Sequence, residues 1–274
     1  MRWAWKIGRF ADIDTYVHGT FLLLVGWAAW AAYSGAGTAL AVMLGVGFLL
    51  AVFASVLMHE LGHALTARRY GIRTRRIILS PIGGLAQLEG MPSNPKHEMA
   101  VALAGPAVNF VLAAALFVAG SFTSSVLLGG FISSLMWANL TLGLFNLVPA
   151  FPMDGGRALR AMLSSRMGNR NATEVAVFIG KGFAIAMAIV GLFTNWMLVA
   201  ISVFVWFAAD QEVKAARWEA AYEDDLRRPL TEWFSRQGRR LSQRPRAVRP
   251  TWDLSGSDWP STSSVRVVVV TSRF

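Results

Sequence analysis

Residues 99–153 read MAVALAGPAVNFVLAAALFVAGSFTSSVLLGGFISSLMWANLTLGLFNLVPAFPM and contain no Asp, Glu, Lys or Arg. Two further stretches, residues 15–59 and 182–209, are equally free of charged residues. A helix needs roughly 20 consecutive apolar residues to cross the hydrocarbon layer of a membrane, and each stretch exceeds that length. The sequence therefore predicts a protein that crosses the membrane several times.

Short break signals divide these stretches into six predicted spans. Clusters of Gly, Ser, Thr and Asn at residues 34–37, 120–125 and 194–195 are typical of turns. The third stretch also extends back into apolar sequence before residue 182. We therefore predict an all-α polytopic membrane protein with about six transmembrane helices, at residues 16–33, 40–67, 99–119, 126–148, 175–193 and 196–209.

The distribution of charge predicts the orientation in the membrane. The chain has 274 residues and a formal net charge of +10, from 26 Lys and Arg against 16 Asp and Glu. Basic loops alternate with uncharged loops, and basic loops face the cytoplasm. This pattern places both termini in the cytoplasm at a plasma membrane, and it explains the net charge without a nucleic acid as partner. The chain has no Cys, which excludes disulfides, thiolate catalysis and cysteine metal sites, and which suits a prokaryotic membrane.

Two segments fall outside the predicted spans. Residues 72–90 carry β-branched residues beside a Pro-Ile-Gly-Gly turn, which predicts a membrane-associated β-hairpin between the second and third helices. Residues 210–274 hold 21 charged residues and form a polar cytoplasmic tail. We expect the tail to be helical at first and disordered beyond Arg244, where Pro, Ser and Arg dominate. The chain thus divides into a membrane-embedded core, residues 1–209, and this tail.

The second predicted span ends in the sequence HELGH at residues 59–63. Residues four apart on a helix lie about 40° apart around its axis, so the imidazoles of His59 and His63 share one face. Two His at this spacing can bind one zinc ion, with the intervening Glu60 as general base. If Arg68 marks the membrane boundary, the motif lies about 13 Å inside it, where a carboxylate is costly and indicates function. A packed His–Glu pair without metal is the alternative.

A catalytic zinc ion needs a third protein ligand, and Asp154 is the strongest candidate. It ends the 55-residue uncharged stretch, in the run FNLVPAFPMDGGR at residues 145–157. The two Pro break the helix there, and the two Gly after Asp154 allow close approach of the backbone. An alternative role for Asp154 is the N-cap of a helix that begins near Arg157, and the two roles are compatible. His18 and His97 are weaker candidates, because one starts a span and the other lies in a polar loop.

The combination of these motifs resembles the site-2 protease family of intramembrane zinc metalloproteases. That family pairs an HExxH motif on one span with a run like that of residues 145–157 on a later span. Two further motifs match: AGPAVN at residues 104–109 resembles the Gly-Pro-x-x-Asn motif of the family's third core helix, and PIGG at residues 81–84 resembles the turn of its membrane-entering β-hairpin. The resemblance covers about residues 1–209.

The resemblance implies the roles of the site residues. One catalytic zinc ion would be held by His59, His63 and Asp154. Glu60 would be the catalytic base, and Asn146 would contact the substrate or its oxyanion. Many relatives carry a pair of CBS repeats or a PDZ domain. The predicted tail is too short for a CBS pair and no PDZ insertion is recognisable, so the resemblance leaves the regulation open.

The implied activity is hydrolysis of peptide bonds within or near transmembrane helices of membrane-protein substrates, in regulated intramembrane proteolysis. Helical peptide bonds are hydrogen-bonded and covered by side chains, so we expect single-span substrates with Gly, Pro or Asn near the cleavage site. Two alternatives stay open: a metal-binding membrane transporter, and a non-catalytic protein that binds membrane partners. The sequence also leaves open a homo-oligomer and the roles of His18 and Asn109.

Overall fold

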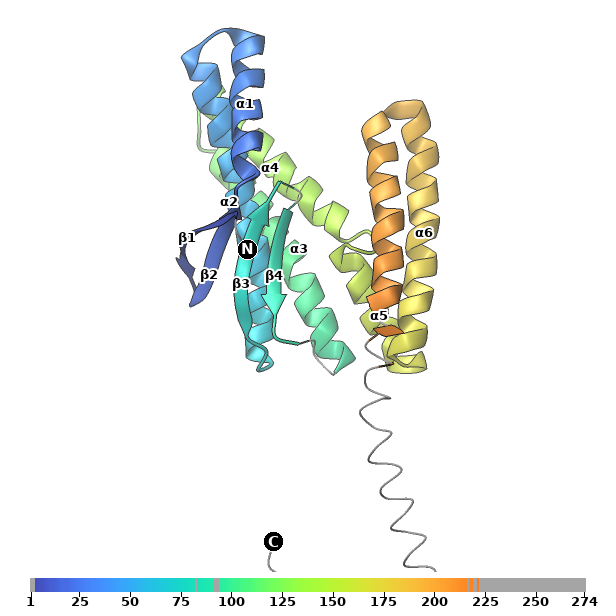
Figure 1. Ribbon diagram of the computed structural model, residues 1–274. Coiled ribbons are helices and arrows are strands. Elements are labelled where there is room, and N and C mark those ends of the chain that lie inside the picture. Colours follow the sequence, from blue (N-terminus) through green and yellow to red (C-terminus); the bar gives the residue numbers. More distant parts are fainter. Residues whose placement is uncertain (1–2, 82, 91–93, 216, 219–220, 222–274) are drawn as a thin grey trace, which may run out of the picture. The chain divides into compact units, whose positions relative to one another are not determined.

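The computed structural model describes residues 3–81, 83–90, 94–215, 217–218 and 221. The expected disordered part of the tail lies outside the described residues. Figure 1 labels the helices and strands, and a further helix over Trp196–Ala215 follows the last labelled one. In chain order the elements are β1 (Ala4–Phe10), β2 (Ile13–His18), α1 (Phe21–Ala36), α2 (Ala39–Arg69), β3 (Thr74–Ser80), β4 (Gly83–Leu88), α3 (Pro95–Gly120), α4 (Val126–Asn146), α5 (Asp154–Met167) and α6 (Asn169–Thr194).

Most of the described helices are long and apolar enough to cross a membrane. Five of them have this length and composition: α2, α3, α4, α6 and Trp196–Ala215. Helix α1 is also apolar but has only 16 residues, fewer than the roughly 20 that a span needs. The prediction of a polytopic helical membrane protein is confirmed, and the helix count is near six. The last helix runs beyond its predicted end at residue 209.

The predicted start of the first span at residue 16 is wrong. Residues Ile13–His18 form strand β2, and α1 begins only at Phe21. Ile13 and Thr15 are buried while the residues between and after them are less so, which is the period of two expected for a strand. The backbone of β2 is paired with β1 on one side and with β3 on the other. The lack of charge at residues 15–18 therefore reflects a strand that is paired on both sides, and not the start of a membrane span.

A four-stranded sheet in the order β1-β2-β3-β4 contacts α2 through β3 and β4 (Figure 1). Strands β3 and β4 form the antiparallel hairpin predicted for residues 72–90, although Ile82 of its turn lies outside the described residues. The parallel pairing of β2 with β3 adds the N-terminal strands, which the sequence did not predict. Lys6 of β1 and Asp14 of β2 form an ion pair at 2.6 Å. The Lys6 hydrogen bond holds the pKa of the Asp14 carboxyl below its ordinary value.

An apolar core fixes the sheet beside the C-terminal half of α2. Ile13 of β2 and Ala64 of α2 are buried together with Ile77 and Leu79 of β3. Complete burial of an Ile or Leu side chain contributes roughly 1.5–3 kcal/mol to the stability of the fold. The cluster therefore holds the sheet against the part of α2 that carries the HExxH motif.

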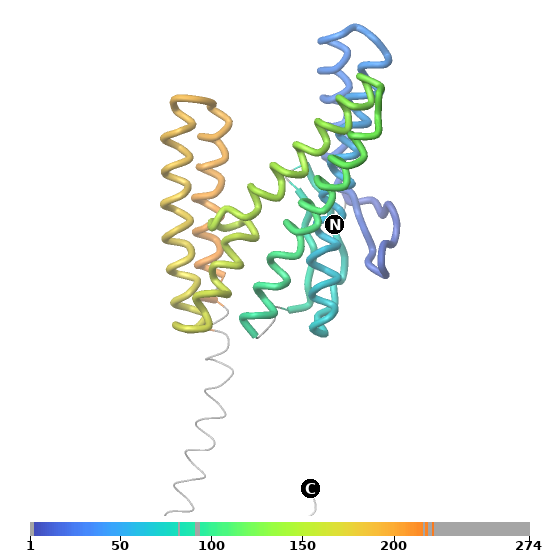
Figure 2. The backbone as a smooth tube through the Cα atoms, turned by 180° about the vertical axis from the view of Figure 1, so that it is seen from behind, coloured from blue at the N-terminus to red at the C-terminus, as the bar shows by residue number. Residues whose placement is uncertain are grey.

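Helix α3 packs against both α2 and α4 (Figure 2). Gly62 lets α2 and α3 approach closely, because a Cβ atom at this position would lie 2.9 Å from the carbonyl oxygen of Ala104. Small residues commonly permit such contacts between helices in membranes. Asn139 of α4 also donates a hydrogen bond of 3.1 Å to the hydroxyl of Ser55 on α2. These contacts hold α2, α3 and α4 together around the motif.

Helix α5 follows the turn after α4 and packs against α3 and α6. An apolar cluster joins the α4–α5 connection to α6 and to the helix Trp196–Ala215. This cluster consists of Ala150, Met153, Ala184 and Val205. The start of α5, where Asp154 lies, is therefore held in place from several sides.

Candidate metal centre

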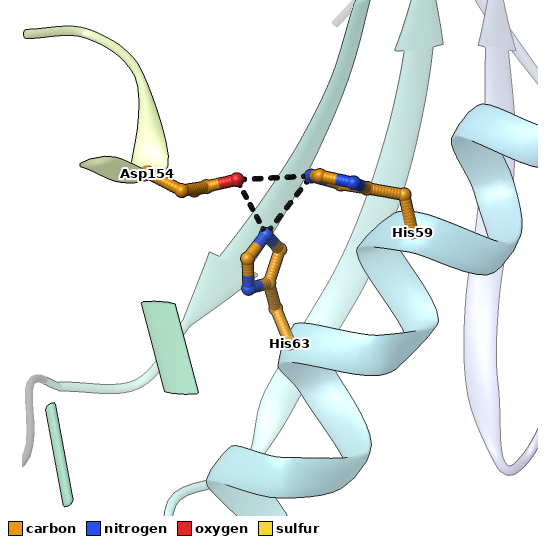
Figure 3. Close-up of side chains that lie close together, drawn as sticks. All are labelled: His59, His63 and Asp154. Carbon is orange, nitrogen blue, oxygen red and sulfur yellow. Dashed lines mark hydrogen bonds and ion pairs between the residues drawn. The ribbon is translucent and has the colours of Figure 1, made fainter. Parts of the chain in front are cut away.

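Helix α2 presents two histidines on one face, one turn apart. The Nε2 atoms of His59 and His63 lie 3.0 Å apart, and their rings are nearly perpendicular, with centroids 4.7 Å apart. The Oδ2 atom of Asp154 lies 3.1 Å from each Nε2 atom (Figure 3). All three residues are buried. The structure thus brings together the three residues that were predicted to bind a metal ion, and we call this set the ligand triangle.

A hydrogen bond to α3 determines which nitrogen of His63 faces Asp154. The Nδ1 atom of His63 lies 2.7 Å from the carbonyl oxygen of Val101. A carbonyl oxygen can only accept, so Nδ1 carries the proton and Nε2 of the neutral ring keeps a free lone pair. Two imidazole nitrogens and one carboxylate oxygen within 4.8 Å of one another are ligands that zinc binds in catalytic sites. The ligand triangle therefore fits one zinc ion.

Helix α3 passes close to the ligand triangle because it has a glycine there. A Cβ atom at Gly105 would lie 2.3 Å from Nε2 of His63 and 2.7 Å from Nε2 of His59. A larger residue would therefore obstruct the nitrogens that face the metal position. Gly105 belongs to the AGPAVN motif at residues 104–109, but the motif alone does not predict this contact, which depends on which face of α3 meets α2.

Asp154 takes its position from the first turn of α5. It is the first residue of that helix, and Met153 is the N-cap residue, without a side-chain capping hydrogen bond. The alternative role of Asp154 as the N-cap of a helix that begins near Arg157 is therefore wrong. Gly155 permits the tight connection, since a Cβ atom there would lie 2.3 Å from the carbonyl oxygen of Leu147. The carboxylate of Asp154 is free to face the two histidines.

A cavity of about 670 Å³ lies beside the ligand triangle. Glu60 lines this cavity together with the triangle, and so do Asn146 at the end of α4 and Asn109 of α3. The Nδ2 atom of Asn146 donates a hydrogen bond of 3.0 Å to the carbonyl oxygen of Leu142. The Oδ1 atom of Asn109 is buried without a hydrogen-bond partner among the described residues. The cavity therefore combines a metal site with one carboxylate and two amides.

Strand β4 forms one wall of the cavity. The residues that line it there are Gly83, Gly84, Leu85, Ala86 and Leu88. Within the part of the chain that the structure describes, β4 is an edge strand, paired only with β3, so one side of its backbone is available for pairing. A Cβ atom at Gly84 would lie 2.5 Å from Cγ of Glu60. An edge strand therefore borders the cavity directly beside Glu60.

The other two described histidine positions lie outside the ligand triangle. The Nδ1 atom of His18 lies 2.8 Å from the hydroxyl of Thr20. The ring of His97 is stacked on Tyr70, with centroids 4.0 Å apart. Among the described residues, the group that could hold a metal ion is His59, His63 and Asp154.

Known proteins with similar sequences include zinc metalloproteases. The model of peptidase family M50 matches residues 47–129 and 124–189. A zinc metalloprotease of Methanocaldococcus jannaschii is 40% identical over 176 residues, which cover 63% of this chain and 51% of that protein. Stage IV sporulation protein FB of Bacillus subtilis is 30% identical over 166 residues, which cover 57% of each chain. This chain thus spans between half and three fifths of the length of these curated relatives, which are prokaryotic.

A solved structure resembles the fold as well. The site-2 protease from Methanocaldococcus jannaschii matches with a TM-score of 0.58 and 35% sequence identity, covering 77% of this chain and 95% of that chain. The family model covers more than half of the present chain, including the HExxH motif and Asp154. The chain therefore belongs to peptidase family M50, the site-2 protease family.

Proposed function

We propose that this protein is an intramembrane zinc metalloprotease that hydrolyses peptide bonds within or near transmembrane helices of membrane proteins, in regulated intramembrane proteolysis. The observation that carries the proposal is that Glu60 lines the same cavity as the ligand triangle of His59, His63 and Asp154. Metal storage or transport needs no acid–base group beside the metal, whereas hydrolysis does. The names of the relatives support the same activity.

The mechanism assigns one role to each group. His59, His63 and Asp154 would hold a zinc ion, which would supply Lewis-acid chemistry for the activation of water and of the scissile carbonyl group. The carboxylate of Glu60 accepts a proton from the attacking water and later donates it to the leaving nitrogen. The amide of Asn146 donates a hydrogen bond to the developing oxyanion, and one such donor contributes about 3 kcal/mol. Its Nδ2 carries two protons, so the bond to Leu142 leaves one available.

The substrate must be unwound before attack, because helical peptide bonds are already hydrogen-bonded. Strand β4 offers an alternative, since an extended segment can add to its free edge and replace helix hydrogen bonds by sheet hydrogen bonds. The cavity residues of β4, and Gly84 beside Glu60, support this placement. Single-span substrates with Gly, Pro or Asn near the cleavage site would unwind most easily. Undiminished cleavage after changing these residues to Leu would contradict this preference.

The core of the protease would comprise residues 1–209 and the cytoplasmic tail residues 210–274, with both termini in the cytoplasm at a plasma membrane. The basic last turn of α2 supports this orientation. Because the chain has no Cys, a single introduced Cys reports its side of the membrane. With a membrane-impermeant reagent on intact cells, we expect labelling of the Ser34→Cys variant and not of the Ser165→Cys variant. Labelling of the Ser165→Cys variant and not of the Ser34→Cys variant would indicate the reverse topology.

The alternatives gain no support from the site or from the relatives. Neither a transporter nor a non-catalytic binding protein explains the position of Glu60 beside the ligand triangle. A homo-oligomer stays a prediction, which the mass of the purified protein in detergent tests.

The decisive experiment compares the wild-type protein with its Glu60→Gln variant. Both are purified, their bound zinc is measured, and both are reconstituted with a candidate single-span substrate. The proposal expects one zinc ion in each protein and cleavage by the wild type alone. Equal cleavage by both proteins, or the absence of zinc from the folded wild type, would contradict it.

A further inference from the structure

A second cluster of charged side chains, largely shielded from solvent, lies between three helices. The guanidinium group of Arg160 on α5 donates to Oε1 of Glu98 on α3 through Nε, at 2.9 Å, and also through Nη2. Its Nη1 atom donates to Oε1 of Glu212, on the helix Trp196–Ala215, at 3.2 Å. The side chains of Arg160 and Glu98 are only 14% and 10% exposed. We call these three residues the arginine clasp.

The chemistry of the clasp is specific to arginine. The planar guanidinium group holds several donors in a fixed fork, so it can bond two carboxylates on different helices at once. The Cζ atom of Arg160 also lies 5.8 Å from the ring centroid of Phe151, in the connection between α4 and α5. Removing one partner of a buried ion pair leaves the other charge uncompensated, which makes such a pair sensitive to substitution. The clasp therefore links α5 to α3 and to the helix Trp196–Ala215.

Arg160 and Glu98 each lie on a helix that contacts or supplies a residue of the ligand triangle. Glu98 lies in the first turn of α3, about one turn before Val101, whose carbonyl oxygen accepts the hydrogen bond from His63. Arg160 lies on α5, whose first residue is the ligand Asp154. The clasp thus joins the helix that orients one ligand to the helix that supplies another.

The contact between Arg160 and Glu212 does not connect to the ligand triangle. Glu212 lies on the helix Trp196–Ala215, which contributes no residue to the ligand triangle. Its side chain is 31% exposed, so its charge is better solvated than that of Glu98. Loss of this branch leaves the connection between α3 and α5 in place.

We propose that Arg160, through its contact with Glu98, is a positioning residue that sets the distance between Asp154 and the two histidines. The inference rests on the metal site of the proposed function. It requires that zinc affinity depends on the Glu98 branch of the clasp and not on the Glu212 branch. A purely structural role would make both branches act on stability alone.

A matched pair of substitutions tests the proposal. Glu98→Gln and Glu212→Gln each neutralise one of the two carboxylates that pair with the guanidinium group of Arg160. Both substitutions preserve the size of the side chain. Zinc affinity is measured by chelator competition on the purified full chain, and the visible spectrum of the Co²⁺-loaded protein reports ligand geometry. Loss of a group that is hydrogen-bonded to a metal ligand typically lowers metal affinity 10–100-fold, and Glu98 acts one contact further out, so the lower end of that range applies. We expect at least a tenfold loss and an altered spectrum for Glu98→Gln, and a change below about twofold for Glu212→Gln.

A second pair of variants separates positioning from folding. Arg160→Gln removes both branches, whereas Arg160→Lys keeps the charge, and we expect the Lys variant to recover part of the affinity. Circular dichroism and gel filtration identify folded protein, and if Arg160→Gln does not fold, the two Glu variants decide alone. Equal losses for Glu98→Gln and Glu212→Gln, or no loss for either, would overturn the proposal. A folded wild type that binds no zinc would instead overturn the proposed function.

Discussion

Replacing Gly105 with Ala tests the metal centre without changing a ligand. The added Cβ atom would lie 2.3 Å from Nε2 of His63 and 2.7 Å from Nε2 of His59, whereas ordinary contacts of a Cβ atom begin at 3.4 Å. Either α3 or the imidazoles must therefore move by about 1 Å. Helix α3 is held on other sides by α4 and α5, so we expect the imidazoles to give way.

The size of the effect follows from this displacement. Zinc ligand distances tolerate changes of about 0.2 Å, so a shift of about 1 Å removes a nitrogen from the metal. Substitutions that disturb the groups around metal ligands lower metal affinity 10–100-fold, and direct obstruction should reach the upper end of that range. We expect zinc binding to weaken about 100-fold. Overpacking should also lower the free energy of unfolding by about 1–3 kcal/mol.

The assay measures zinc affinity of the purified variant by chelator competition, alongside cleavage of a single-span substrate. Gly120→Ala on the same helix is the matched control, because its Cβ atom would meet Ile132 at an ordinary 3.5 Å. We expect this control to bind zinc like the wild type. Zinc binding by Gly105→Ala at wild-type affinity would refute the placement of α3 against the ligand triangle.

Four further outcomes are expected. Glu60→Gln should lower the cleavage rate about 10²–10⁴-fold, the usual contribution of a general acid–base group, with zinc content unchanged. Gly84→Ala should impair cleavage while retaining zinc, because its Cβ atom would lie 2.5 Å from Cγ of Glu60; loss of zinc would contradict this. Asn146→Ala should lower the turnover rate about 10²–10³-fold, which single-turnover cleavage measures. Chelation should abolish cleavage and added zinc should restore it, and activity that survives complete removal of zinc would exclude the mechanism.

The parts of the site that share one helix could be predicted from the sequence. His59 and His63 lie on one face because of helical geometry alone, and their position inside an apolar span made Glu60 conspicuous. Asp154 could be predicted because a charged residue at the end of a long uncharged stretch is costly without a function. The spans after the first could also be predicted, because length and apolar composition suffice to define them.

The remaining features depend on contacts between distant segments, which local patterns do not encode. The sequence around Tyr16 lacks charge in a strand as it does in a membrane helix, and only the pairing of β2 with β3 distinguishes the two. Gly105 carries no signal of its closeness to the histidines, because the adjacent side chains come from another helix. Arg160 lies between the fourth and fifth predicted spans, where the sequence gives no sign of its ion pairs, and its low exposure follows from the three helices that meet around it.

The helical geometry of the motif also explains why two different glycines serve one site. Glu60 follows His59 by one residue, so it lies about 100° around the axis of α2, whereas His63 lies about 40° around it. The histidines and the carboxylate therefore face different neighbours. Gly105 of α3 makes room at the imidazole nitrogens, and Gly84 of β4 makes room at the carboxylate. Metal binding and proton transfer thus depend on separate packing contacts. Substitution of Gly84 should therefore impair cleavage with zinc affinity retained, whereas substitution of Gly105 should weaken zinc binding and, through it, cleavage.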